Sequence, residues 1–410
     1  MSIEEIRDDI DRNGTGKAIV VLDRDHVAES VDATATTTAV DAQGRVSRTA
    51  PAVRQDRIAA LQGHFVDSRM VHFPFLGVVH GAVDHAGLDR LADHEATHKV
   101  IHAPDLTTIA PVRSNSVHAP PADVTWGLRR MKAAEIWQRG YSGRHIVVAH
   151  LDSGADSQHP ALRGAIDKYA VFDSNGNEVK TQGPYSDGDD HGTHTAGTLA
   201  GRKADGTPVV GMAPGAELID ARIVGHGDTI ARVLAGMNWA LEKGARVVNL
   251  SVGFPGWKES FESIIGILRA QQLLPVVAIG NDGAGRTRSP GNFPTVLSVG
   301  ATGSDDKVAA FSSSHKAGDK GTGPMLCAPG VKILSARPGG GYREADGSSM
   351  AAPHVAGLAA LLFSAKPDAT IDEVEQAIVR SCENPAGEDA TRIGAGIPDG
   401  VAALNRLLGK

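Results

Sequence analysis

The sequence predicts an α/β protein with a mostly parallel sheet covered by helices on both faces, preceded by a smaller α+β domain. From residue 124 onward, short β-rich runs alternate with helical segments. These runs are almost continuously apolar, as expected for parallel strands that are buried on both faces. A Pro- and Ser-bearing segment at residues 108–123 precedes them, and the composition of the chain changes there.

The N-terminal part of the chain predicts a layer of its own. Residues 1–15 are expected to be disordered or weakly helical. Residues 16–107 follow the order β-α-β-β-α-β of a split βαβ unit, interrupted at 26–51 by a polar tract that predicts a flexible insertion. Residues 108–123 are interpreted as a linker, and residues 124–410 as the larger domain.

Hydrophobic patterns indicate the main elements of the larger domain. The expected strands are 145–151, 218–223, 246–252, 274–279, 296–299 and 331–334. The expected helices are 191–201, 229–243, 260–271, 349–364 and 371–382. In such sheets ligands bind at the carboxyl ends of the strands, so polar residues at those ends are the first candidates for a site.

Composition excludes several classes of function. The 41 Lys and Arg residues are outnumbered by 48 Asp and Glu, and no basic run predicts nucleic-acid binding. No uncharged apolar stretch reaches about 18 residues, so no membrane span is expected. The first residues are acidic and lack the apolar core of a secretory signal, which leaves the cytoplasm or a non-classical export route open. Cys327 and Cys382 are expected to be free thiols.

Four polar residues stand at strand ends and helix starts: Asp152, His191, Asn281 and Ser349. Taken singly, each has a structural explanation, since Ser349 suits a helix N-cap and Asp152 suits a turn. Taken together, they match acyl-transfer chemistry. A serine needs a base to accept its proton, the imidazole needs a carboxylate to orient it, and the oxyanion needs donors. Ser349 would be the nucleophile, His191 the base, Asp152 the orienting carboxylate and Asn281 an oxyanion donor beside the Ser349 amide.

Four motifs in the order Asp, His, Asn, Ser resemble those of the subtilisin-like serine proteases. They are Asp152-Ser-Gly, His191-Gly-Thr-His-Thr-Ala-Gly, Gly280-Asn-Asp-Gly and Gly347-Ser-Ser-Met-Ala-Ala-Pro-His. The resemblance covers about residues 125–408. It implies a subtilisin-like fold and a serine endopeptidase that acts on polypeptides.

The same resemblance implies further roles. Ser251, Val252 and Gly253 would form the strand that pairs with extended substrate, and Ala278, Ile279 and Gly280 would line the first side-chain pocket. Asp282 stands at the rim of that pocket and is a weak indication that the pocket attracts basic side chains of the substrate. The N-terminal layer is similar to the family's inhibitory propeptide, which implies self-processing within residues 108–123. Because proline restricts extended geometry, we expect the cut between Arg113 and His118 rather than beside Pro120 or Pro121.

No cofactor or metal is required by this chemistry. His191 and His194 are three residues apart, but no HExxH pattern accompanies them, and His194 is interpreted as a packed residue. Family members often hold calcium with an aspartate where this chain has Ala161, so that site is expected to be absent, while calcium elsewhere stays open.

Two other classes of function stay open. A protease homologue could bind peptides without cutting them, and an esterase could use the same triad. The Gly-x-Ser-x-Gly elbow of α/β-hydrolases is missing.

Overall fold

A seven-stranded sheet organises the larger domain. The computed structural model describes residues 2–23, 37–50, 55–103, 107–117, 123–181, 187–204, 206–225, 227–316 and 320–410. The sheet order is β10-β11-β9-β12-β14-β16-β17, and all its neighbours are parallel. The bounds are β9 Val147–Asp152, β10 Ile166–Val171, β11 Glu217–Arg222, β12 Val247–Leu250, β14 Leu274–Ala278, β16 Leu297–Thr302 and β17 Leu326–Pro329. The expected parallel α/β fold is confirmed.

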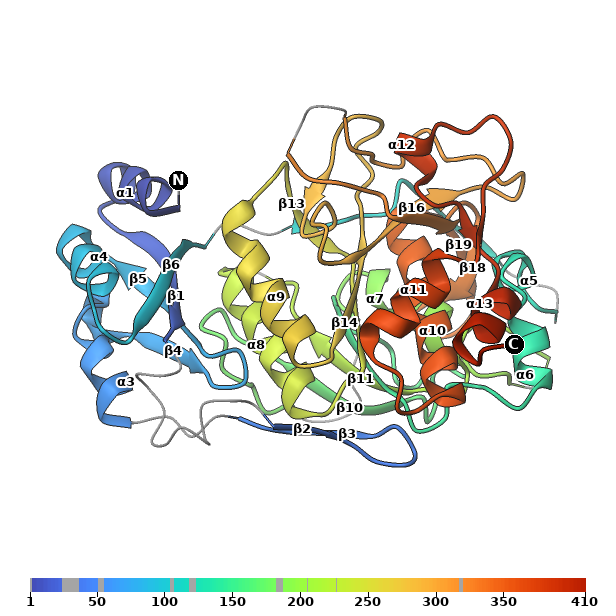
Figure 1. Cartoon of the computed structure of the whole chain (residues 1–410), viewed down its shortest axis with the longest axis horizontal. Helices are drawn as coiled ribbons and strands as arrows, with labels where there is room; N and C mark the ends of the chain where they lie inside the picture. The colour runs from blue at the N-terminus through green and yellow to red at the C-terminus, as the bar shows by residue number, and fades with distance from the viewer. Residues whose placement is uncertain are drawn as a thin grey trace.

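Helices cover both faces of this sheet (Figure 1). One face packs against α7 (His191–Ala200) and α10 (Ser348–Ala365), together with α11 (Ile371–Val379) and α13 (Gly400–Leu407). The other face packs against α8 (Thr229–Glu242) and α9 (Glu262–Ala270). Within the described part of the chain, α10 alone is long and apolar enough for a membrane span, but 89% of it is buried as a core helix.

The N-terminal domain contains the predicted β-α-β-β-α-β order. Its antiparallel sheet runs β4-β5-β1-β6. The bounds are β1 Gly16–Leu22, α3 Gln55–Gln62, β4 Met70–Phe73, β5 Val78–Val83, α4 His85–Ala92 and β6 Thr97–His102. Residues 2–13, for which the sequence predicts disorder or weak helix, form the helix α1 (Ser2–Asn13), because Ile6 and Ile10 pack against the sheet.

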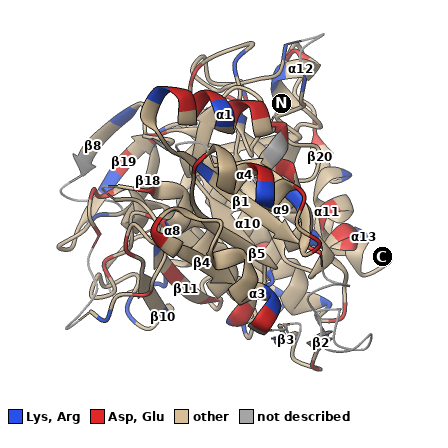
Figure 2. Ribbon diagram, turned by 90° about the vertical axis from the view of Figure 1, so that its left-hand side faces the viewer, with Lys and Arg blue, Asp and Glu red and all other residues tan. Residues whose placement is uncertain are grey.

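The two faces of the N-terminal sheet have different partners. Helices α1, α3 and α4 cover the outer face and carry charged side chains to the surface (Figure 2). On the inner face Ile19, Val21, Phe73 and Ile101 join the apolar cluster that contains α8 and α9. The N-terminal domain is therefore seated on these two helices of the larger domain (Figure 1).

Several elements were not expected from the sequence. Part of the predicted insertion, 26–36, lies outside the described residues, but 37–49 form the hairpin β2 (Thr37–Val40) and β3 (Val46–Thr49). The expected strand 331–334 is β18 (Ile333–Ala336), which joins a separate antiparallel sheet with β19 (Tyr342–Asp346) and β8 (Arg113–Val117). The remaining elements are η2 Val66–Ser68, β7 Thr107–Thr108, α5 Trp126–Arg130, α6 Ala133–Gln138, β13 Val252–Pro255, η3 Glu259–Phe261, β15 Arg288–Ser289, β20 Cys382–Glu383, α12 Ala390–Ile393 and β21 Ile397–Pro398.

Candidate active site

Asp152 and His191 meet where a strand ends and a helix begins. Asp152 is the last residue of β9, and His191 is the first residue of α7. Asp152 Oδ1 lies 2.7 Å from His191 Nδ1, and both side chains are buried. The close approach needs a glycine after the histidine, since a Cβ on Gly192 would lie 1.9 Å from the carbonyl oxygen of Gly154. The motifs Asp-Ser-Gly and His-Gly thus fit each other sterically.

The electrostatics of this pair keep the carboxylate charged. Burial opposes the charge on Asp152, but the charge and hydrogen bond of His191, with His150 behind them, lower the pKa of Asp152 to about 2. Burial also opposes the charge on His191, but Asp152, Asp189 and Asp187 outweigh it and raise the pKa of His191 above its usual value. An imidazole with a raised pKa is a stronger base.

Ser349 lies in the first turn of α10 and is fully buried. Its Oγ donates to Sδ of Met350 at 3.3 Å rather than to His191. Within the described part of the chain, His191 Nε2 has no hydrogen-bond partner. The Asp–His contact of the predicted triad is therefore formed in this structure, and the Ser–His contact is not.

Asn281 is aimed by its neighbour Ser348. The Asn281 side-chain oxygen accepts from the Ser348 amide at 2.8 Å and lies 2.9 Å from Ser348 Oγ. Ser348 Oγ is also 3.0 Å from the carbonyl oxygen of Gly280. With its oxygen held, the Asn281 Nδ2 group points away and donates to the carbonyl oxygen of Ala110 at 2.9 Å. The sequence did not reveal this role of Ser348, for which the only signal was a second hydroxyl beside Ser349.

Residues 107–117 cross the site as an extended chain. On one side, β7 pairs antiparallel with Val252 and Gly253 of β13, and the Ile109 amide donates to the Ser251 carbonyl at 2.9 Å. On the other side, the Val112 amide donates to the Asp346 carbonyl at 2.7 Å, and β8 pairs with β19. The Ala110–Pro111 peptide bond lies between these two pairings, with its carbonyl on Asn281.

The other predicted binding residues directly precede Asn281 in the chain. Ala278 and Ile279 are buried at the carboxyl end of β14. Gly280 follows with φ of +117°, and a Cβ there would meet Ser313 Oγ at 2.9 Å, so the position requires glycine.

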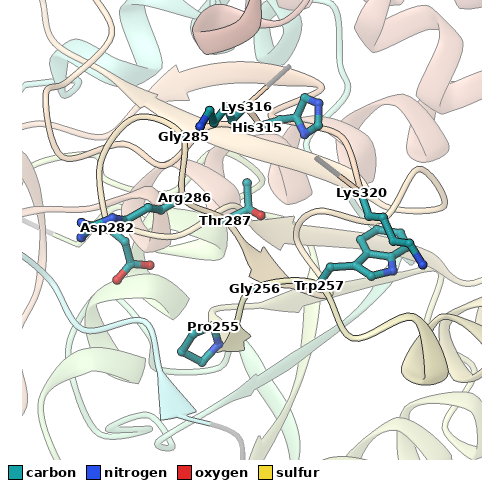
Figure 3. A pocket seen from close by; sticks show the side chains of 10 residues that line it. All are labelled: Pro255, Gly256, Trp257, Asp282, Gly285, Arg286, Thr287, His315, Lys316 and Lys320. Atoms are coloured by element: carbon teal, nitrogen blue, oxygen red, sulfur yellow. The ribbon is translucent and has the colours of Figure 1, made fainter. Parts of the chain in front are cut away.

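A pocket of about 580 Å³ lies between residues 255–257 and residues 285–287 (Figure 3). Asp282 lines it, but Nε of Arg288 holds the Asp282 carboxylate at 2.7 Å and lowers its pKa. The other charged side chains that line it are Arg286, Lys316 and Lys320. Asp282 therefore presents a paired carboxylate among basic groups, which does not support the predicted attraction of basic side chains.

A second buried His–Asp pair lies behind Asp152. His150 Nδ1 is 2.6 Å from Asp220 Oδ1, and His150 Nε2 is 2.8 Å from Thr195 Oγ1. The Thr195 hydroxyl lies 3.2 Å from Asp152 Oδ2. The sequence pattern does not reveal this network, although a histidine within the apolar run His145–Leu151 is a visible irregularity.

Three minor predictions can be placed on the structure. His194 is fully buried, its Nε2 lies 2.9 Å from the Ile333 carbonyl, and burial followed by Arg343 lowers its pKa to about 3, which fits a packed residue. Cys327 and Cys382 are free. Ala161 packs against Val210 and Tyr342, and the described residues contain no cluster of three or more His, Cys, Asp or Glu side chains that could hold a metal. The expected lack of the family's calcium site stays a prediction.

Comparisons with known proteins agree with this geometry. The Subtilase family profile matches residues 143–397, which is more than half of the chain. Subtilisin E of Bacillus subtilis is 34% identical over 266 residues, covering 63% of this chain and 65% of its own length. Subtilisin Savinase of Lederbergia lenta is 36% identical over 248 residues, covering 60% and 86%.

Alkaline elastase YaB of a Bacillus species is 30% identical over 345 residues and covers 83% of each chain. This match is longer than the 268 residues from position 143 to position 410 and therefore includes residues that precede position 143. The chain spans just under two thirds of the length of relatives such as subtilisin E. On the family profile and these identities, the chain belongs to the subtilase family.

Proposed function

We propose that this chain is a serine endopeptidase made as a zymogen, and that the bond it presents to its own active site is Ala110–Pro111. One observation carries the proposal: the Ala110 carbonyl accepts a hydrogen bond from Asn281 at 2.9 Å while the chain pairs with the enzyme on both sides. A carbonyl held by an oxyanion donor is in the position of a carbonyl about to be attacked.

In this proposal each site residue has one task. Ser349 Oγ leaves the Met350 sulfur, gives its proton to His191 Nε2 and attacks the carbonyl carbon of Ala110. Asp152 holds the imidazole through Nδ1 and stabilises its charge. Asn281 Nδ2 donates to the new oxyanion. The C–N bond then breaks, His191 protonates the nitrogen of Pro111, and water releases the acyl group from Ser349 in a second round.

The register differs from the sequence-based expectation of a cut between Arg113 and His118. Backbone pairing sets it, because Val252 and Gly253 fix residues 107–108 and β19 fixes residues 113–117. The residue after the presented carbonyl is Pro111, whose ring nitrogen carries no hydrogen and whose φ is fixed. The Pro111 nitrogen is therefore a poor leaving group, and we expect slow self-cutting and a long-lived zymogen.

The N-terminal domain would act as the inhibitor in this zymogen. Its inner face shares an apolar cluster with α8 and α9, and the segment that follows it occupies the substrate path. Polypeptides in extended form are the substrate class that this path supports, since Ser251 and Gly253 pair with the backbone of residues 107–109.

Replacing Ser349 with Ala tests the proposal. The purified wild-type chain should separate slowly into a fragment that ends at Ala110 and a catalytic remainder, as read by mass spectrometry, and should react with an active-serine probe. Ser349→Ala should stay whole and unreactive, while Ser47→Ala, a change at an exposed serine, should behave as wild type. A Ser349→Ala chain cut as readily as wild type would refute self-processing.

The same preparation separates the two rival functions. A peptide-binding homologue would not react with the probe in either form. An esterase would turn over a simple ester in preference to an extended peptide, whereas the proposed endopeptidase should prefer the peptide.

A further inference from the structure

The hairpin β2–β3 reaches the larger domain at the C-terminal ends of α8 and α9. It belongs to the N-terminal part of the chain but forms a two-stranded sheet of its own. Its turn is closed by Asp41, whose Oδ1 accepts from the amides of Gln43 and Arg45 at 2.9 Å each. In Figure 1 the hairpin lies along the edge of the larger domain, below the ends of α8 and α9.

Arg48 of this hairpin inserts its guanidinium into the larger domain. Its Nε donates to the Gln271 carbonyl at 2.9 Å, and its Nη1 donates to the Leu241 carbonyl at 3.2 Å. Its Nη2 donates to the carbonyls of Ala245 at 2.9 Å and Gln272 at 3.2 Å. The residue is only 8% exposed. All three guanidinium nitrogens are therefore engaged by backbone oxygens of the larger domain.

These four carbonyls lie at the C-terminal ends of two helices. Leu241 is in the last turn of α8 and Ala245 follows that helix, while Gln271 and Gln272 directly follow α9. Helix C-termini carry partial negative charge, so two of them converge on the cation. Burial, and then the neighbouring Arg246, lower the pKa of Arg48 to about 9, and no carboxylate is among the causes. Carbonyl dipoles therefore compensate the buried charge.

The surrounding surface fits the hairpin backbone as well as the side chain. A Cβ on Gly44 would lie 3.0 Å from Ile146 Cδ1 and 3.2 Å from Pro367 Cβ. A Cβ on Gly244, just after α8, would lie 2.1 Å from the Val46 carbonyl oxygen. Glycines on both sides thus allow the two backbones to approach, and Val46 is buried in the contact.

We propose that the carbonyls of Leu241, Ala245, Gln271 and Gln272 form a guanidinium-binding site that anchors the N-terminal part of the chain independently of the active site. The occupant in the zymogen is Arg48. The planar fork of a guanidinium reaches all four acceptors at once, which the single ammonium of a lysine does not. The N-terminal part is then held at three places: the substrate path, the faces of α8 and α9, and this anchor. Cutting the chain leaves the contacts with α8 and α9 and the Arg48 anchor in place.

The test uses the full chain with Ser349→Ala, so it does not depend on self-processing. A recognition sequence for a site-specific protease replaces residues 118–122, the chain is immobilised by its C-terminus and cut, and release of the N-terminal piece is followed by surface plasmon resonance. Arg48→Ala should speed release about tenfold or more, since several charge-assisted hydrogen bonds are lost. Arg48→Lys keeps the charge and the aliphatic part of the side chain, so its release rate should lie between those of wild type and Arg48→Ala.

Arg90→Ala is the matched control, because Arg90 is an exposed arginine on α4, on the outer face of the N-terminal domain. It should release at the wild-type rate. Hydrogen exchange of the β1 amides, measured before the cut, should be the same in all variants, which would show that the N-terminal sheet is intact. Release of Arg48→Ala at the wild-type rate, or full recovery by Arg48→Lys, would overturn the guanidinium site.

Discussion

The buried pair His150–Asp220 gives a prediction that can be worked from the structure. Both side chains are fully buried and their atoms lie 2.6 Å apart. Burial and then Asp152 raise the pKa of Asp220, while Asp220 raises the pKa of His150 against the effect of burial. A protonated His150 donates to Asp220 through Nδ1 and to Thr195 through Nε2, which leaves the Thr195 hydroxyl free to donate to Asp152.

Removing one partner of such a pair leaves an uncompensated buried group, which costs about 3–5 kcal/mol, whereas replacing both partners by apolar groups is often neutral. We therefore expect His150→Val to lower the unfolding free energy by about 3 kcal/mol or more. The double variant His150→Val, Asp220→Val should lose less unfolding free energy than the two single variants lose together, by about 2 kcal/mol.

Urea unfolding of the Ser349→Ala chain measures these values without self-digestion, using the transition of the larger domain. In the active chain His150→Val should also lower kcat with little change in KM, because the link to Asp152 through Thr195 is lost. Losses that add within about 0.5 kcal/mol would refute the coupling of the pair. An unchanged kcat would show that the His150–Asp220–Thr195 network contributes to stability and not to catalysis.

Further predictions concern the candidate site. Asn281→Leu should lower kcat roughly a hundredfold or more with little change in KM, a magnitude known from this same family, and a change confined to KM would assign Asn281 to binding. Pro111→Ala should speed conversion of the zymogen, followed by mass spectrometry, and an unchanged rate would show that proline does not limit it. His191 must be neutral to act as base and its pKa is raised, so kcat/KM should rise with pH through a value above 6.5. Asp189→Asn removes one of the charges that raise this pKa and should move the acidic limb to lower pH.

Much of the fold was predictable because the apolar runs are strong signals. The helices α7, α8 and α10 lie within one or two residues of the predicted ranges, since each has a clear start and an apolar face. The strand β17, with the sequence Leu-Cys-Ala-Pro, was missed because four residues that end in proline do not predict the edge of a parallel sheet. For residues 1–15 the sequence left disorder and weak helix open, because the stability of α1 comes from the packing of Ile6 and Ile10 and not from its acidic sequence.

Some residues of the candidate site could likewise be predicted from the sequence, and others could not. The positions of Asp152, His191, Asn281 and Ser349 at strand ends and helix starts could be predicted, because each lies in a recognisable motif. The partners that orient them could not, since Ser348, Thr195 and Asp220 act through tertiary contacts. The same holds for Arg48, whose four acceptors are backbone carbonyls about 190 to 220 residues away along the chain. Backbone acceptors leave no trace in a sequence.

The parts of the site differ in how far they are assembled, and this difference indicates which step limits self-cutting. Asn281 is already aimed at the Ala110 carbonyl by Ser348, and the contact between Asp152 and His191 is formed. Within the described part of the chain, Ser349 Oγ donates to the Met350 sulfur and not to His191, and a thioether sulfur is a weak acceptor. Rotation of one serine side chain crosses a small barrier compared with amide cleavage. The slow step is therefore expected to be departure of the Pro111 nitrogen, so Pro111→Ala should raise the rate of self-cutting while a change at Met350 that removes the sulfur, Met350→Leu, should leave that rate nearly unchanged.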